Sequence, residues 1–179
     1  HGNQCFELHQ ALPVEGRGLV NRSRVVELTD KGSGALLCVL THLVGPDGTL
    51  YASHEHGLFL KGMGNFGGER GAKHVQAAPP HAPPDAQLTL HTLPHQALLY
   101  RLSGDYNPLH ADPSFARSVG FPRPILHGLC TFALVARALI SLQPPLPAPS
   151  PLRSLKGRFA APVFPGESVT VQVWHGRGE

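Results

Sequence analysis

Proline-rich stretches constrain this chain of 179 residues more than any other feature of its sequence. Residues 77–85 read AAPPHAPPD. Closely spaced prolines hold the backbone extended and remove main-chain donors, so this stretch fits neither a helix interior nor a central strand. It predicts a stiff, exposed connector between two modules. A second proline-rich stretch, at 144–151, ends the longest helical pattern of the chain.

The composition is that of a globular protein, with 41% hydrophobic residues. Its length fits one ordinary domain or two small ones. The formal net charge of +3 is too small, and its residues too scattered, to argue for nucleic acid. No apolar run approaches the roughly 18 residues that span a bilayer, so we expect no membrane partner.

Cysteine and histidine spacing argues against disulfides and structural metal. The three cysteines are far apart and form no C-x-x-C motif, which indicates neither a disulfide framework nor a zinc ribbon and favours a reducing compartment. The twelve histidines lack the tight spacing of a structural metal site. We therefore expect most of them at the surface.

Strand patterns dominate the part before the connector. Residues 18–29 alternate enough for a strand, and two apolar runs on either side of Gly45-Pro46-Asp47-Gly48 predict an antiparallel pair. Residues 61–71, KGMGNFGGERG, are too rich in glycine for a regular element. We predict a first module at 1–76 and the connector at 77–87.

The remaining residues, 88–179, predict an α+β module. A helix is expected within 95–103, and a short one after Asp112 with Pro113 in its first turn. Residues 128–142 carry apolar side chains at helical spacing with few charges, which predicts a long, largely buried helix. Strands are expected at 154–160 and 167–174.

Two neighbouring motifs carry groups suited to catalysis: YRLSGDYNPLH at 100–110 and PILHGL at 124–129. Asp105 and His110 are side chains that can act as acid or base on water near neutral pH. Gly128 is expected at a helix start, where its backbone N–H can stabilise a developing oxyanion. A D-x-N-P turn alone is more often an Asx-turn or helix cap, but the combined spacing favours an active site. His127 is expected to support the helix start or to pack.

Two other patterns suggest ligands but have weak context. Residues 62–67 satisfy G-x-G-x-x-G, yet more glycines and the prolines follow where a dinucleotide-binding turn needs a helix. His54 and His56 share one face of a predicted strand, but they lack a third metal ligand. We interpret the first as a loop and the second as a solvated strand face.

Longer segments resemble a known family. YRLSGDYNPLHADPSFA and GFPRPILHGLCTF resemble, nearly residue for residue, the signature of the MaoC-like R-specific enoyl-CoA hydratase 2 family. That family includes the hydratase 2 domain of peroxisomal multifunctional enzyme type 2. LTDKGSG, FLKGMGNFGG and RFAAPVFPGE are similar to its flanking segments. The resemblance covers nearly the whole chain.

The resemblance implies an α+β double hot-dog fold, in which antiparallel sheets wrap around long central helices, here truncated at both ends. It implies a hydro-lyase that reversibly hydrates trans-2-enoyl-CoA to (R)-3-hydroxyacyl-CoA in fatty acid β-oxidation or related lipid synthesis. Asp105 and His110 would hold one water, Asn107 would orient the water or the aspartate, and the Gly128 N–H would bind the thioester oxygen. No metal is expected, and no cofactor beyond the CoA of the substrate.

The resemblance also guides expectations about substrate, partners and location. The CoA part is expected near basic side chains, for which the candidates are Arg101, Arg123, Lys156 and Arg158. A homodimer and a peroxisomal location in a eukaryote, or a cytoplasmic one in a bacterium, are expected. The alternatives are a non-catalytic acyl-CoA-binding hot-dog module and, less favoured, a thioesterase.

Overall fold

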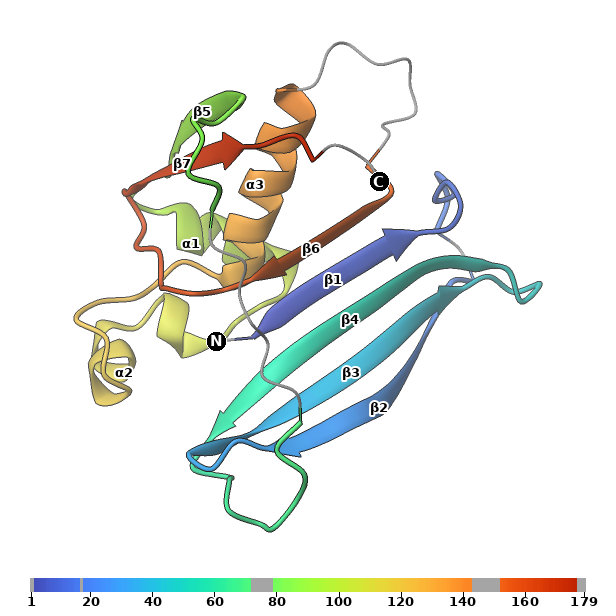
Figure 1. The fold of residues 1–179 in the computed structure, drawn as a ribbon, viewed down its shortest axis with the longest axis horizontal. Coiled ribbons are helices and arrows are strands. Elements are labelled where there is room, and N and C mark those ends of the chain that lie inside the picture. Colours follow the sequence, from blue (N-terminus) through green and yellow to red (C-terminus); the bar gives the residue numbers. More distant parts are fainter. Residues whose placement is uncertain (1, 17, 72–78, 143–151, 177–179) are drawn as a thin grey trace. The chain divides into compact units, whose positions relative to one another are not determined.

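The computed structural model describes residues 2–16, 18–71, 79–142 and 152–176 (Figure 1). Residue contacts divide the chain into two compact units. The first comprises His1–Ala77 and Pro147–Ala160, and the second comprises Ala78–Leu146 and Ala161–Glu179. The break near residue 77 coincides with the start of the predicted connector. The proline-rich stretch at 144–151 lies outside the described residues.

The first unit is a five-stranded antiparallel sheet in the order β2-β3-β4-β1-β6 (Figure 1). Its strands are β1 (Asn3–Leu8), β2 (Val20–Asp30), β3 (Gly34–Val44), β4 (Leu50–Lys61) and β6 (Ser154–Arg158). β3 is an almost continuous apolar run, as expected of a strand with neighbours on both sides, and it contributes the buried Ala35, Cys38 and Val44.

The predicted hairpin between β3 and β4 is confirmed. Its turn is closed by the Gly45 N–H, which donates to the Thr49 carbonyl at 2.8 Å. Gly48 has a φ of 85°, a conformation that favours glycine. The Asp47 carboxylate accepts from the Thr49 N–H at 3.1 Å, which fixes the direction of the turn.

Two strands differ from the sequence expectation. β1 was not predicted, because NQCFEL is short and has no clear alternation, but it pairs with both β4 and β6. β6 lies within the predicted strand at 154–160, but the sequence did not indicate its partner: it hydrogen-bonds to β1, with Cys5 opposite Lys156. The contacts thus place residues 147–160 with the first unit, whereas the sequence division grouped them with 88–179. Pairing between distant strands cannot be read from local pattern.

In the part that the structure describes, the second unit combines a β-ribbon with three helices. β5 (Ala86–His91) pairs with β7 (Ser168–Val173), and the helices are α1 (Gln96–Tyr100), α2 (Pro113–Ser118) and α3 (Gly128–Ser141). Two 3-10 turns, η1 (Arg101–Ser103) and η2 (Pro108–His110), lie between α1 and α2. All three helices begin close to the residues that the sequence predicted.

A small core lies beside the motifs at 100–110 and 124–129 in this unit. Ala97 of α1, Leu126 of the preceding loop and Cys130 of α3 form a buried cluster, against which Tyr100, Leu134 and Val163 pack. Burial in this core raises the pKa of the Cys130 thiol, so the thiol is neutral at pH 7. The cluster joins α1 to the start of α3, the two elements that flank the motif.

The expectation that α3 is largely buried is wrong. Only Cys130 and Ala138 are buried, whereas Leu129 and Ile140 are 42% and 44% exposed. Within its unit, α3 packs on the two strands β5 and β7, and a two-stranded ribbon covers only one side of a helix (Figure 1). Among the described residues, no helix is both long and apolar enough to span a membrane.

Candidate active site

The motif at 100–110 folds as a sharp turn between two 3-10 turns. η1 is followed by Gly104, whose φ of 108° favours glycine and reverses the chain direction. Asp105, Tyr106 and Asn107 follow as an exposed link. Asn107 then caps η2: its side-chain oxygen accepts from the Leu109 N–H at 3.0 Å, and Pro108 occupies the first position.

Asp112 caps the start of α2 in the same way. Its carboxylate accepts from the Ser114 and Phe115 N–H groups at 2.7 and 3.3 Å. These backbone hydrogen bonds, that of Ser114 first, hold the pKa of Asp112 below its usual value. Asp112 is therefore committed to the helix start and is not free to act as a base.

Three titratable side chains from separate segments meet beside this turn. One ligand atom each of Asp105, His110 and His127 lies within 4.8 Å of the others. Two groups at this separation can share one water, since each needs a heavy-atom distance of about 2.8 Å to it. The structure thus brings together Asp105 and His110, the two residues predicted to act as acid and base.

The orientation of His110 is fixed by its Nδ1, which lies 2.8 Å from the Ile125 carbonyl. A carbonyl oxygen only accepts, so Nδ1 carries the hydrogen and Nε2 keeps a lone pair. The side chain is half-buried. His110 therefore presents Nε2 as the atom that can take a proton.

His127 is buried at the start of α3, with 2% of its surface exposed. Its Nε2 donates to the Asp105 carbonyl at 3.2 Å, and its ring stacks on the His110 ring with centroids 3.8 Å apart. Burial first, and the neighbouring His110 second, lower the pKa of His127. The prediction that His127 packs at the helix start is confirmed, but its contacts with both Asp105 and His110 were not anticipated.

Tyr100 completes the packing around His127. Its ring lies 4.8 Å from the His127 ring. Burial first, then the nearby Cys130 and Asp105, raise the pKa of Tyr100, so the phenol is neutral at pH 7. The sequence signal for this residue was only its place at the start of the motif.

Gly128 is the first residue of α3 and is exposed. The first backbone N–H groups of a helix have no partner within it and carry partial positive charge. The chain therefore presents a main-chain donor directly after His127. The role of this N–H as an oxyanion donor stays a prediction.

Asn107 acts differently from its expected role in one respect. Its backbone N–H donates to the Asp105 carboxylate at 3.1 Å, while its side-chain oxygen caps η2. The Asp105 carboxylate is thus held by the backbone N–H of Asn107 rather than by the side-chain amide of Asn107. Orientation of a water by the remaining side-chain N–H₂ stays a prediction.

The four basic residues expected near CoA lie in different surroundings. Arg101 donates to the Tyr106 carbonyl at 3.2 Å and lies over the Tyr106 ring. Arg123 donates to the Pro165 carbonyl at 3.0 Å and lies over the Phe164 ring. Lys156 and Arg158 are on β6, in the first unit. CoA binding by any of them stays a prediction.

Asp105, His110 and His127 are also residue types that bind metal ions. A metal needs lone pairs that converge on one point, usually from at least three side chains. The Nε2 of His127 is used by the Asp105 carbonyl, and its Nδ1 is buried without a hydrogen-bond partner in the described structure. Asp105, the His110 Nε2 and the His127 Nδ1 keep lone pairs, so the expectation that this site holds no metal stays a prediction.

The two weaker patterns lie in the first unit. Residues 62–67 form a loop that opens no helix, as expected. His54 and His56 stack with centroids 5.2 Å apart, and His54 hydrogen-bonds Gln4. His54 is half-buried, so this strand face is less solvated than expected, and the burial lowers the pKa of His54. Among the residues described, the His54 and His56 pair gathers no third metal ligand.

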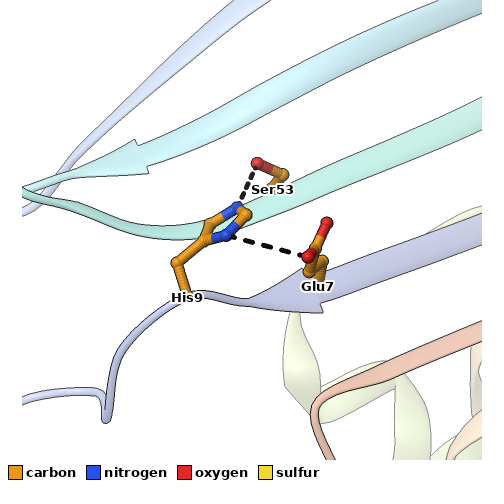
Figure 2. Close-up of polar contacts among 3 residues, drawn as sticks. All are labelled: Glu7, His9 and Ser53. Carbon is orange, nitrogen blue, oxygen red and sulfur yellow. Dashed lines mark hydrogen bonds and ion pairs between the residues drawn. The ribbon is translucent and has the colours of Figure 1, made fainter.

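Glu7 of β1, His9 just after β1 and Ser53 of β4 form a polar contact in the order acid, imidazole, hydroxyl (Figure 2). The His9 Nε2 lies 2.8 Å from the Ser53 hydroxyl, and its Nδ1 lies 3.9 Å from the Glu7 carboxylate. An activated nucleophile needs a base that a third group orients at hydrogen-bond distance, and 3.9 Å is too long for that. His9 and Glu7 are also open to solvent. We assign no chemistry to this contact.

Comparison with known proteins identifies the family. The MaoC-like domain family matches residues 75–179, more than half of the chain, so the chain belongs to this family. Enoyl-CoA hydratase ChsH3 of Mycobacterium tuberculosis is 41% identical over 97% of this chain and 60% of its own length. Peroxisomal multifunctional enzyme type 2 of Mus musculus is also 41% identical, over 97% of this chain and 24% of its own length.

Solved structures agree on the fold. A MaoC-like dehydratase from Phytophthora capsici superposes with a TM-score of 0.82 and 35% identity over 99% of this chain and 60% of that chain. A Mycobacterium tuberculosis protein described as a double hot-dog fold matches with a TM-score of 0.59 and 18% identity, which bears on the fold alone. The chain thus has the predicted double hot-dog class of fold. It spans about 60% of the length of the first relatives it matches.

Proposed function

We propose that this protein is an R-specific 2-enoyl-CoA hydratase, a hydro-lyase that reversibly converts trans-2-enoyl-CoA to (R)-3-hydroxyacyl-CoA. The observation that carries the proposal is the approach of the Asp105 carboxylate and the His110 imidazole to within 4.8 Å beside the start of α3. The names of relatives with about 40% identity, several of them enoyl-CoA hydratases, support it.

The reaction needs three groups, and the site offers a candidate for each. Asp105 and the His110 Nε2 hold one water, from which a base takes a proton as the oxygen bonds to C3 of the substrate. The electron pair of the double bond moves toward the thioester, whose oxygen becomes enolate-like beside the Gly128 N–H. Delivery of the proton to C2 completes the addition of one water.

The site acts on the thioester directly and uses no cofactor beyond the CoA of the substrate. Arg101, Arg123, Lys156 and Arg158 are the candidates for contacts with CoA. The protein acts as a homodimer, in peroxisomes if it comes from a eukaryote, as the names of the relatives from Mus musculus and Arabidopsis thaliana suggest, or in the cytoplasm of a bacterium.

The test is an absorbance assay with trans-2-decenoyl-CoA, whose conjugated thioester loses ultraviolet absorbance on hydration. Chiral analysis of the product is expected to give the R-3-hydroxyacyl ester with wild type and none with Asp105→Asn. Binding of the ester without an absorbance change would replace the proposal with an acyl-CoA-binding module. Release of free CoA, measured with a thiol reagent, would replace it with a thioesterase.

A further inference from the structure

The link that carries Asp105 has little packing to hold it. Residues 102–108 are all exposed, so their position depends on hydrogen bonds rather than on burial. Two side chains hold the main-chain carbonyls of this link: Arg101 binds that of Tyr106 and His127 binds that of Asp105. Of these two, only His127 also contacts the second candidate catalytic group.

His127 has a chemical feature that simple packing does not explain. Its ring is buried, yet its Nδ1 has no hydrogen-bond partner within the described structure. Burying an unpaired polar atom costs free energy, and a phenyl ring would stack in the same place without that cost. What the phenyl ring lacks is the Nε2–H that donates to the Asp105 carbonyl at 3.2 Å.

His127 also contacts the other members of the site. Its ring stacks on His110 with centroids 3.8 Å apart and an interplanar angle of 27°. Its own carbonyl accepts from the Cys130 and Thr131 N–H groups at 3.1 and 3.2 Å, which starts α3 and places Gly128. One residue therefore touches the Asp105 link, the His110 ring and the helix start.

We propose that His127 is a positioning residue of the hydration reaction, which holds the Asp105 main chain and the His110 ring at the separation that one water bridges. The inference rests on the proposed function. His127 does not exchange a proton with the substrate. It acts through Asp105 and His110, and its loss lowers kcat because reacting groups displaced by about 1 Å can lose about 100-fold in rate.

The main test is His127→Phe, which keeps a flat ring for stacking and removes the Nε2–H. We expect kcat to fall about 10- to 100-fold and KM to stay within about threefold, because the acyl-CoA contacts are not altered. The matched control is His91→Phe, since His91 makes an exposed hydrogen bond to Ser168 on the β5–β7 ribbon of the same unit. Its kcat should equal that of wild type.

A second pair of variants separates positioning from folding. Glutamine places an amide N–H near the position of Nε2, whereas asparagine places it near that of Nδ1. We expect His127→Gln to recover part of the lost rate and to exceed His127→Asn by about tenfold in kcat. This pair carries the test if His127→Phe does not fold.

The outcomes distinguish this inference from the proposed function. Wild type that hydrates no enoyl-CoA removes the proposed function. Wild type that hydrates it, with kcat of His127→Phe within twofold of wild type or with equal kcat for the Gln and Asn variants, overturns only the role of His127. A rise in KM with unchanged kcat would also overturn it, because His127 would then act on substrate binding.

Discussion

At the scale of single residues, hydrogen bonds to the main chain fix the directions of the Asp105 and His110 side chains. Asp105 receives the Asn107 N–H on its carboxylate, and His110 is oriented by the Ile125 carbonyl. Neither hydrogen bond consumes the lone pair that the proposed chemistry needs. The two side chains thus remain available to a water while their directions are fixed.

Substitution of either residue should nearly abolish hydration. We expect Asp105→Asn and His110→Ala each to lower kcat/KM by roughly 10²- to 10⁴-fold, the contribution of a positioned acid or base. Because both residues act on one water, kcat/KM of the double variant should lie only a little below that of the less active single variant. Steady-state rates with trans-2-decenoyl-CoA measure this.

The control for these variants is Asp85→Asn. Asp85 accepts from the His175 N–H at 2.7 Å in the same unit but outside the site, so the variant should keep full activity. Either single variant that retains more than about a tenth of wild-type activity loses its assigned catalytic role.

The sequence made Asp105 and His110 predictable because both lie in one short motif. It did not reveal that the Asn107 side chain caps η2 while its main chain holds Asp105. Nor did it reveal the contacts of His127, which depend on a carbonyl and a ring brought close by folding. Residue types were readable from the pattern, but the donor and acceptor atoms were not.

At the scale of elements, side chains at strand ends fasten the irregular segments. Thr92, which is 5% exposed, follows β5 and donates from its hydroxyl to the Glu167 carbonyl at 2.7 Å. The same oxygen accepts from the Gly166 N–H at 2.9 Å. One hydroxyl thus anchors the turn that leads into β7.

Removal of this hydroxyl should destabilise the second unit. We expect Thr92→Val to lower the free energy of unfolding by about 1–2 kcal/mol, because it removes both hydrogen bonds of a buried hydroxyl, while the Glu167 carbonyl still accepts from the Thr92 N–H. Urea unfolding followed by circular dichroism measures this. Thr89→Val is the control: its exposed hydroxyl pairs with that of Thr170, and the change should stay within about 0.5 kcal/mol. Equal effects of the two variants would contradict the explanation.

The glycine-rich loop at 62–71 is fastened by Asp30, the last residue of β2. The buried carboxylate accepts from the Gly32 and Asn65 N–H groups at 2.8 Å each and from the Gly67 N–H at 3.1 Å. These hydrogen bonds, that of Gly32 first, lower the pKa of Asp30. The charged form therefore binds the loop more strongly than the neutral form does.

The loop should loosen in acid. Because the pKa of Asp30 is lower in the folded state, its stabilisation is present above about pH 4 and is lost as the pH falls through the folded pKa. Asp30→Asn should show the loss at neutral pH, with about tenfold less hydrogen-exchange protection of the Asn65 and Gly67 amides. Asp47→Asn, in the β3–β4 turn, should leave both amides protected. Unchanged protection in Asp30→Asn would show that the loop is held by other contacts.

Element types were largely predictable, whereas element partners were not. Helix starts at Asp112-Pro113 and Gly128 and the turn at Gly45–Gly48 follow from local chemistry, and the structure has them there. The pairing of β6 with β1, and the exposure of Leu129 and Ile140 on α3, depend on which distant segments are adjacent. Local patterns carry no information on that adjacency.

At the scale of the whole molecule, β2, one of the two edge strands of the five-stranded sheet, exposes several apolar side chains. β2 lies at the sheet edge and exposes Val20, Val25, Val26 and Leu28 by 53%, 60%, 41% and 51%. A long edge strand with apolar side chains is a site of pairing with another chain. We expect this edge to mediate self-association, consistent with the proposed homodimer.

A charge on this strand should oppose association. We expect Val25→Lys to raise the apparent dimer dissociation constant about tenfold. A valine buried in the dimer interface contributes about 1.5 kcal/mol or more, and the lysine loses this contribution. Sedimentation velocity over a range of concentrations measures the constant. Val14→Lys, at a loop valine that is 105% exposed, should leave it unchanged. A wild-type protein that stays monomeric at every concentration would contradict both the role of the β2 edge and the proposed homodimer.

The path of the chain through β6 has a consequence for fragments. The first unit needs residues from both sides of the second, since β6 comes after α3 in the sequence and pairs with β1. A single cut in the segment 79–85 therefore yields no fragment with a complete unit. The N-terminal fragment lacks the edge strand β6, and the C-terminal fragment carries β6 without the sheet to which it belongs. The two fragments should each be unstable alone and should reassemble when mixed, so the chain can be split into parts but not shortened to either unit.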